Sequence, residues 1–462
     1  MNIADQTMMS PYVQRISSRI IAALVALGVS LTAFPQSTNT LPDSAGLDDC
    51  ISYAMDHQPM VKQLRLDEKI NRQDIRIAYS DWLPQITSSA DYQRYLKQPV
   101  IFLPNFSDPS GPNREITTGV KNNSTISFSA SQVIFNQNVY LAARTADYYR
   151  KQAKQNTEDA LIGLVVDITK AYYAVLSTTQ QVRIIREDTV RITKSLHDAY
   201  ARYEAGASDE IDYKRAQISL NNAKAQLTSA RQNLEVARSN LKKLIGYPEG
   251  QSIELAVNDS SMEQEILINP PRKPDYTSRI EYQLLNTRLQ LQKAQVDYYR
   301  FSFLPSLSGY ANYNLAYHND NFGDLYSRAF PNSSVGLTLN FPIFEGSGRL
   351  SKLKKANFQY ERLKLDTLNL RDNLNLEYQR AIATYKSSYA AWQSTADNVK
   401  IAREVYQTVK YQYDQGIKSY LEVIVSETDL RTAELNKINA LFSLLSAKTD
   451  VERALGRINV NY

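Results

Sequence analysis

An internal duplication limits the fold of this 462-residue chain more than any other feature. Four short segments of the first half return in the second half in the same order, at an offset of about 210 to 220 residues. The pairs are Trp82-Leu83-Pro84 with Phe303-Leu304-Pro305, Val133-Ile134-Phe135 with Pro342-Ile343-Phe344, Tyr203-Glu204-Ala205-Gly206 with Tyr413-Asp414-Gln415-Gly416, and Leu244-Ile245-Gly246 with Ala454-Leu455-Gly456. Solenoid repeats are several times shorter, so the spacing indicates a duplicated half.

Both halves follow one plan: a helix, two strands around a polar loop, and a long helix that turns at a glycine and runs back. We expect the first repeat over 37–248, with a helix at 47–80, strands at 84–98 and 122–135, and a helical hairpin at 137–246. A linker over 249–275 follows. The second repeat covers 276–462, with a helix at 276–301, strands at 305–318 and 332–344, and a hairpin at 349–457.

The strand segments alternate between apolar and small polar residues. Val335, Leu337 and Leu339 fall on one face of the segment 333–343, and small or polar residues fall on the other. Strands of about ten residues with this pattern are typical of a transmembrane barrel wall, and a soluble β-sandwich is the alternative. Four strands cannot close a barrel, since such barrels begin at about eight strands, so a membrane wall requires several chains. Three chains would supply twelve strands.

The helical segments are too long for a compact domain. Between 137 and 205 there is no proline and a single glycine, Gly163, and a helix of this length would extend roughly 100 Å. Its apolar residues follow a heptad pattern that includes Leu161, Val165, Ile168 and Tyr172. No segment after residue 36 reaches the ~20 consecutive apolar residues that we expect of a membrane-spanning helix. The sequence therefore predicts a mainly α-helical fold with a small β portion.

The N-terminal segment has the features of a secretory signal peptide. Arg15 and Arg19 precede an apolar run of about 14 residues, and Pro35 follows it. We expect residues 1–36 to be removed on export; an uncleaved N-terminal anchor is the alternative. The single cysteine, Cys50, has no partner for an intramolecular disulfide, and we expect it to be a small buried residue on the first helix after the signal peptide.

The duplicated plan resembles the TolC family of outer-membrane efflux proteins. The resemblance covers nearly all of the chain after residue 36, and it rests on the ordered landmarks above and on two glycine turns, Tyr203 to Asp212 and Tyr413 to Glu422. It implies a homotrimer with a shared twelve-stranded barrel in the outer-membrane lipid. It also implies a helical tunnel that crosses the periplasm, and docking to a periplasmic adaptor protein and an inner-membrane pump, for efflux or type I secretion.

The resemblance also assigns roles at the two turns. It implies a periplasmic gate in which Asp212, Tyr413 and Lys418 hold the two hairpins together, while Glu422 of three chains forms a ring of carboxylates. Val425 stands where a second acidic ring is known in the family. Adaptor docking is expected at Gly206, Ala207, Ser208, Gly416, Ile417 and Ser419. The alternative for Asp209 and Ser419 is that they only cap the return helices.

The composition argues against the other classes of function. The net charge is +5 with no basic run interleaved with aromatics, so we expect no nucleic-acid partner. The three histidines, His57, His197 and His318, show no metal-binding spacing, and no nucleophile or phosphate-binding motif occurs. We therefore predict no enzyme activity, catalytic residue, cofactor or metal. A periplasmic coiled-coil scaffold without a channel remains the alternative to an exit duct.

Overall fold

The computed structural model describes residues 41–42, 44–104, 113–256, 266–268 and 275–461, and the chain divides into the units Met1–Pro42 and Asp43–Tyr462. The predicted signal peptide, 1–36, lies outside the described residues, as does part of the predicted linker 249–275. All the helices and strands of the described residues belong to the unit Asp43–Tyr462.

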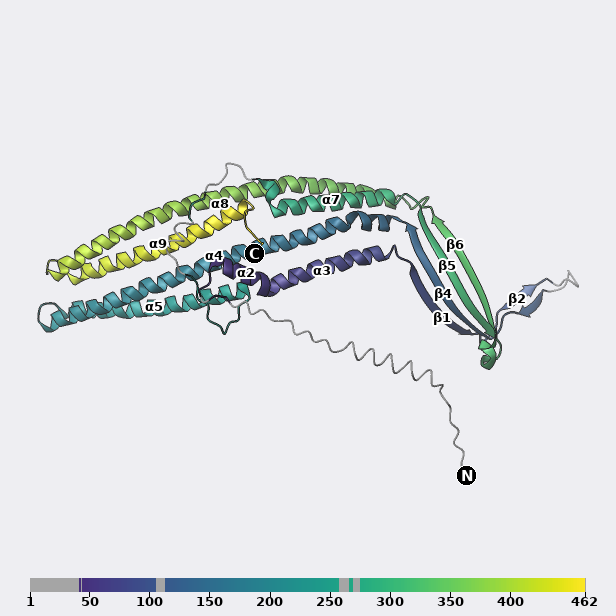
Figure 1. Cartoon of the computed structure of the whole chain (residues 1–462), viewed down its shortest axis with the longest axis horizontal. Helices are drawn as coiled ribbons and strands as arrows, with labels where there is room; N and C mark the ends of the chain where they lie inside the picture. Colours follow the sequence, from purple (N-terminus) through teal and green to yellow (C-terminus); the bar gives the residue numbers. More distant parts are fainter. Residues whose placement is uncertain (1–40, 43, 105–112, 257–265, 269–274, 462) are drawn as a thin grey trace, which may run out of the picture. The chain divides into compact units, whose positions relative to one another are not determined.

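Helices and strands follow the same order twice (Figure 1). The first series contains α2 (Leu47–His57), α3 (Pro59–Ser80), β1 (Gln85–Arg94), β4 (Asn122–Phe135), α4 (Gln137–Glu204) and α5 (Glu210–Ile245). The second contains α7 (Ile280–Phe301), β5 (Ser306–Asn319), β6 (Ala329–Asn340), α8 (Gly348–Asp414) and α9 (Tyr420–Ala454). The mainly helical fold with a small β portion is thus confirmed.

Several local expectations were wrong. The strand expected over 84–98 ends at Arg94, and the strand expected over 332–344 covers Ala329–Asn340. The helix expected over 47–80 is two helices, because Pro59 lacks an N–H group and starts α3, where the side chain of Gln58 accepts a hydrogen bond from the N–H of Met60. The helix expected from residue 276 begins with a 3₁₀ turn, η1 (Tyr276–Ser278). The polar loops also hold structure: β2 (Val100–Leu103) pairs with β3 (Arg114–Thr117), and η2 (Phe322–Ser327) precedes β6.

The four longer strands form one antiparallel sheet in the order β1-β4-β5-β6. Its register places apolar side chains of all four strands in rows on one face, for example Ile86, Ala130, Ala311 and Val335. The adjacent row, Thr87, Ser129, Asn312 and Ser334, is polar and belongs to the other face. Apolar side chains on β6 and just after it are largely exposed: Val335, Leu337, Leu339, Phe341 and Ile343.

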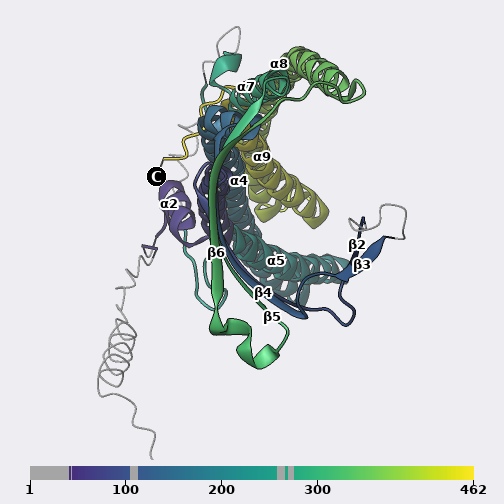
Figure 2. The same cartoon turned by 90° about the vertical axis from the view of Figure 1, so that its right-hand side faces the viewer.

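The helices continue the order of the strands. α3 packs on α4, α4 on α7, and α7 on α8, so β1 with α3 and β6 with α8 form the two free edges of the layer. At the end away from the sheet the two hairpins, α4–α5 and α8–α9, meet along α4 and α9 (Figures 1 and 2).

Helix α4 is the central element of the unit. Of the predicted seam residues, Val165, Ile168 and Tyr172 are buried and Leu161 is half-buried. We expected no helix that could cross a membrane, yet one 18-residue stretch of α4 is apolar enough to do so by length and composition alone. In the structure 61% of this stretch is buried against the rest of the protein, so it belongs to a core helix.

Cys50 is fully buried on α2, as expected. Burial, with a smaller contribution from the charge of Asp49, raises the pKa of its thiol to about 12, so the residue serves packing and not thiolate chemistry.

Candidate functional site

The two hairpin tips have the same backbone geometry. Gly206 and Gly416 lie in the left-handed region, with φ of 70° and 76°, as the sequence predicted. In the first tip the N–H of Gly206 donates to the carbonyl of Tyr203 (2.9 Å) and the N–H of Ala207 to that of Arg202 (2.8 Å). The second tip repeats both bonds from Gly416 and Ile417 at 2.9 and 2.8 Å. Glycine is needed at both tips, because this helix-ending motif requires positive φ.

The return helices start with different caps. Asp209 accepts a hydrogen bond from the N–H of Ile211 at 3.2 Å. In the second tip the carboxylate of Glu422 accepts from the N–H of Ser419 at 3.1 Å, which completes the predicted capping box. Capping thus accounts for the local conformation of Ser419 and Asp209, and any contact with a partner would be additional.

The tips of the two hairpins share a small apolar core. Tyr413 of α8 and Tyr420 of α9 are 6% and 2% exposed, and they pack with Val423 against Ala199 of α4 and Ala216 of α5. Burial raises the pKa of both tyrosines. Four helices therefore meet around Tyr413.

The polar partners of Tyr413 differ from those expected. The guanidinium of Arg202 on α4 lies 4.7 Å from the centre of its ring and 3.8 Å from the carboxylate of Asp414. Lys418 bonds to Glu422 on its own hairpin, at 2.7 Å, and lowers the pKa of that carboxyl. Within the described residues Asp212 forms no ion pair. Lys418 and Asp212 are therefore not joined, because Lys418 already has an acid one turn away.

Further from the tips, polar pairs link α4 to α9 at successive levels. Lys170 bonds to Asp450 at 2.6 Å, and Gln181 bonds to Asn439 at 2.8 Å. Nearer the tips, Asp188 bonds to Arg431 at 2.9 Å. Because the two helices run antiparallel, these pairs follow one another along the junction of the two repeats.

At the end of this series nearest the tips lies a cluster of four charged side chains that the sequence analysis missed. Its two acids are buried, and the side chains of Arg191 and Arg431 are 27% and 16% exposed. Asp188, 0% exposed, accepts from Arg431 of α9 at 2.9 Å and from Arg191 of its own helix at 3.1 Å. Arg191 also lies 3.5 Å from Glu427 of α9, which is 4% exposed. A signal existed: Asp188 falls between Ile185 and Ile192 on the apolar stripe of its helix.

The residues expected to dock a partner are accessible. Gly206, Ala207, Gly416, Ile417 and Ser419 are exposed, and Ser208 is half-buried. Large apolar side chains also stand free at the tips, among them Ile211, Ile417 and Leu421.

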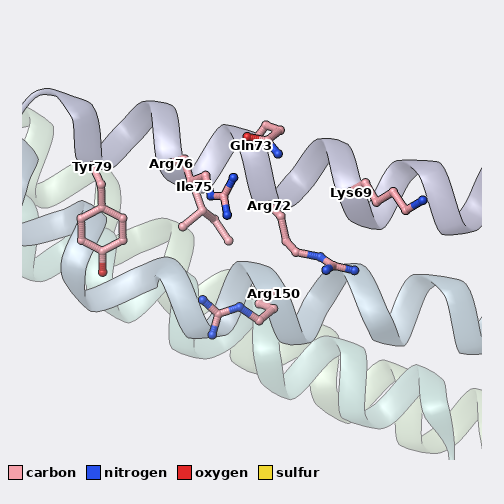
Figure 3. A pocket seen from close by; sticks show the side chains of 7 residues that line it. All are labelled: Lys69, Arg72, Gln73, Ile75, Arg76, Tyr79 and Arg150. Carbon is pink, nitrogen blue, oxygen red and sulfur yellow. The ribbon is translucent and has the colours of Figure 1, made fainter. Parts of the chain in front are cut away.

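A separate cavity of about 350 Å³ lies between α3 and α4, next to the sheet (Figure 3). Its lining contains Lys69, Arg72, Arg76 and Arg150 and no acidic side chain. Arg150 bonds to Asp147 at 2.7 Å, outside this lining. The cavity belongs to the sheet end of the helical layer and is no part of the tips.

Comparison with known proteins decides the family. The family model "Outer membrane efflux protein" matches residues 50–247 and 283–457, which is most of the chain. The chain belongs to the outer membrane efflux protein family. It is 20% identical to the outer membrane protein TolC of Vibrio cholerae over 338 residues, which cover 71% of this chain and 76% of that protein.

Two further matches agree with this assignment. The solvent efflux pump outer membrane protein SrpC of Pseudomonas putida is 22% identical over 66% of this chain and 64% of its own length. The crystal structure of the outer membrane protein VceC of Vibrio cholerae superposes with a TM-score of 0.69 at 16% identity, over 89% of this chain and 96% of that one. As a member of this family, the chain is an outer-membrane efflux channel that extends into the periplasm. It is not an enzyme, and the periplasmic scaffold is excluded.

Proposed function

We propose that three copies of this outer membrane efflux protein form one exit duct, closed at the hairpin tips, that docks to a periplasmic adaptor and an inner-membrane pump. The single observation that carries the trimer is the sheet: four strands with one apolar and one polar face, and free edges at β1 and β6. Pairing β1 of one copy with β6 of the next leaves no free edge, and three copies give twelve strands.

The gate is proposed to be the junction of the two hairpins. In the closed state Tyr413 and Tyr420 pack against α4 and α5, and Arg202 contacts both Tyr413 and Asp414. Opening requires α8–α9 to move away from α4–α5, which exposes this core. Asp212 and Lys418 contribute to the electrostatics of the tip, and not through a bond to each other.

Glu422 is proposed to give the narrow end a preference for cations. Its side chain is 43% exposed and remains ionised, because Lys418 lowers its pKa. Three copies would bring three such carboxylates to one level, although each is partly neutralised by its own Lys418. Val425, one turn later and also exposed, adds no charge.

Docking of the adaptor is proposed at both tips. The exposed glycines allow close approach of a partner backbone, and Ile417 offers an apolar contact. The relative SrpC is named as the outer membrane protein of a solvent efflux pump, which supports assembly with a pump.

The test is planar-bilayer conductance of the detergent-extracted protein, with its mass measured in parallel. We expect a trimer and small, steady, cation-preferring currents. Glu422→Gln should reduce the cation preference and weaken block by divalent ions, whereas Asp429→Asn, an exposed acid on the same helix, should leave both unchanged. A monomer without channel activity would refute the proposal.

A further inference from the structure

We infer that the buried cluster Asp188, Arg191, Glu427 and Arg431 is a proton-controlled latch, in which Glu427 must take up a proton for the two hairpins to pack fully. The inference deepens the proposed gate and rests on it for its effect on the channel. It concerns residues that neither the family resemblance nor the comparisons assign.

The four charged side chains form a row of contacts between two helices, in the order Arg431, Asp188, Arg191 and Glu427. α4 supplies Asp188 and Arg191, and α9 supplies Glu427 and Arg431. The two acids are not equivalent, since Asp188 accepts hydrogen bonds from both guanidinium groups, at 3.1 and 2.9 Å. Glu427 has only the longer, 3.5 Å approach of Arg191.

Glu427 is therefore the poorly satisfied member of the cluster. Within the described residues its buried Oε1 atom and the Nε atom of Arg191 each lack a hydrogen bond. A buried carboxylate oxygen without a donor is costly, and a protonated carboxyl in the same place is much less so. The geometry alone thus favours neutral Glu427 when the hairpins are packed.

The surrounding elements add no compensating cation. On α8, Tyr406 faces Glu427 and Asp188, and burial raises its pKa, so it remains neutral. On α5, the side chains that line the adjacent cavity of about 450 Å³ are Ser219, Asn222, Ala225 and Gln226, all uncharged. Both cations near Glu427 are thus already bonded to Asp188.

Proton uptake by Glu427 gives the packing a definite pH dependence. Burial, together with the charge of Asp188, raises the pKa of Glu427 to about 7. In the separated hairpins this carboxyl meets water and titrates near the ordinary value of 4.5. Packing therefore binds a proton between these values. The packed state gains stability as pH falls below 7 and loses it as pH rises through 7.

The experiment compares the full-length protein with Glu427→Gln, which keeps the shape and removes the charge, and with Asp429→Asn as the control. Amide hydrogen exchange of α9 over 423–431 is measured at about pH 4, below the ordinary value of the carboxyl, and at about pH 8, as the ratio of parent to variant at each pH, so that the intrinsic pH dependence cancels. Parent and Glu427→Gln should exchange alike at the lower pH. At the higher pH the parent should exchange roughly tenfold faster than the variant, and Asp429→Asn should match the parent throughout.

Channel recordings of the same proteins separate the two proposals. Current that rises with pH in the parent and not in Glu427→Gln supports the latch. An unchanged exchange ratio, or equal pH dependence of parent and variant, overturns it. If no protein conducts but the exchange ratio still changes tenfold, the latch stands and the closed-duct proposal fails. Should Glu427→Gln not fold, exchange of α9 relative to α3 within the parent gives the same titration, and a flat profile near pH 7 refutes the latch.

Discussion

The sheet and the hairpin junction place their side chains in opposite ways. The sheet exposes apolar residues: Leu337, for example, is 71% exposed. The junction buries charged ones, of which Asp188 is wholly covered and Glu427 nearly so. In a soluble monomer both would be unfavourable, because exposed apolar surface and buried charge each cost free energy.

The difference reflects what each region contacts. Lipid covers the apolar face of a membrane sheet, so the exposed side chains meet a suitable solvent and hold the protein in place. A gate has to separate on demand, and an interface of paired charges is easier to separate than an apolar one, because each charge regains its hydration when the helices part. Under the proposed function, the sheet remains where it is and the junction opens.

The largest effect is expected from breaking the buried cluster. Asp188→Ala leaves Arg191 and Arg431 without their shared acceptor and should destabilise hairpin packing by about 3–5 kcal/mol. Thermal unfolding and hydrogen exchange of α4 and α9 would measure this loss. Asp397→Ala, which removes the exposed ion pair with Lys400 on α8, should cost less than about 1 kcal/mol.

A double replacement sharpens this test. Asp188→Leu combined with Arg431→Met fills the same space with apolar groups and should recover much of the lost stability, because replacing both partners avoids an unpaired charge. Such a variant should be more stable than Asp188→Ala yet open less readily. Equal stability of Asp188→Ala and the parent would show that charge burial is not what distinguishes the junction from the sheet.

A smaller effect is expected on the sheet, where the two faces provide their own control. Leu337→Arg puts a cation on the lipid-facing side, at a cost of about 2–4 kcal/mol near the middle of the membrane. Thr338→Arg places the same charge on the polar face of β6 and should be tolerated. Insertion into lipid vesicles, with resistance to heat in detergent measured afterwards, would test both. Similar behaviour of the two variants would contradict the assignment of the faces.

The sequence predicted these two regions unequally, for physical reasons. A period of two fixes which strand residues share a face, so the sheet and its apolar side were predictable from sites such as Val335 and Leu337. The glycine turns were predictable because positive φ at Gly206 and Gly416 excludes most other residues. The break between α2 and α3 was also predictable, because Pro59 lacks the N–H group that a continuous helix would need there.

The cluster at the junction depends on tertiary structure. Asp188 and Arg431 lie 243 residues apart, and only the packing of α4 on α9 brings them together. By contrast, the pair at the exposed tip is local, because helical spacing places Glu422 one turn after Lys418. Asp188 and Glu427 each lie on an apolar stripe of their helix, Glu427 between Val423 and Leu430. An acid in such a position is the sequence signal that would have indicated a partner on another element.

The smallest effect is expected at the exposed end of the second tip. Lys418→Ala breaks a pair whose side chains are 40% and 43% exposed, and such pairs contribute about 0–1 kcal/mol. Its thermal stability should therefore remain near that of the parent, whereas cation preference should rise, because Glu422 loses its neighbouring positive charge. A large loss of stability in Lys418→Ala would mean that the tip, like the cluster above it, depends on paired charge, and the contrast between exposed and buried pairs would then fail.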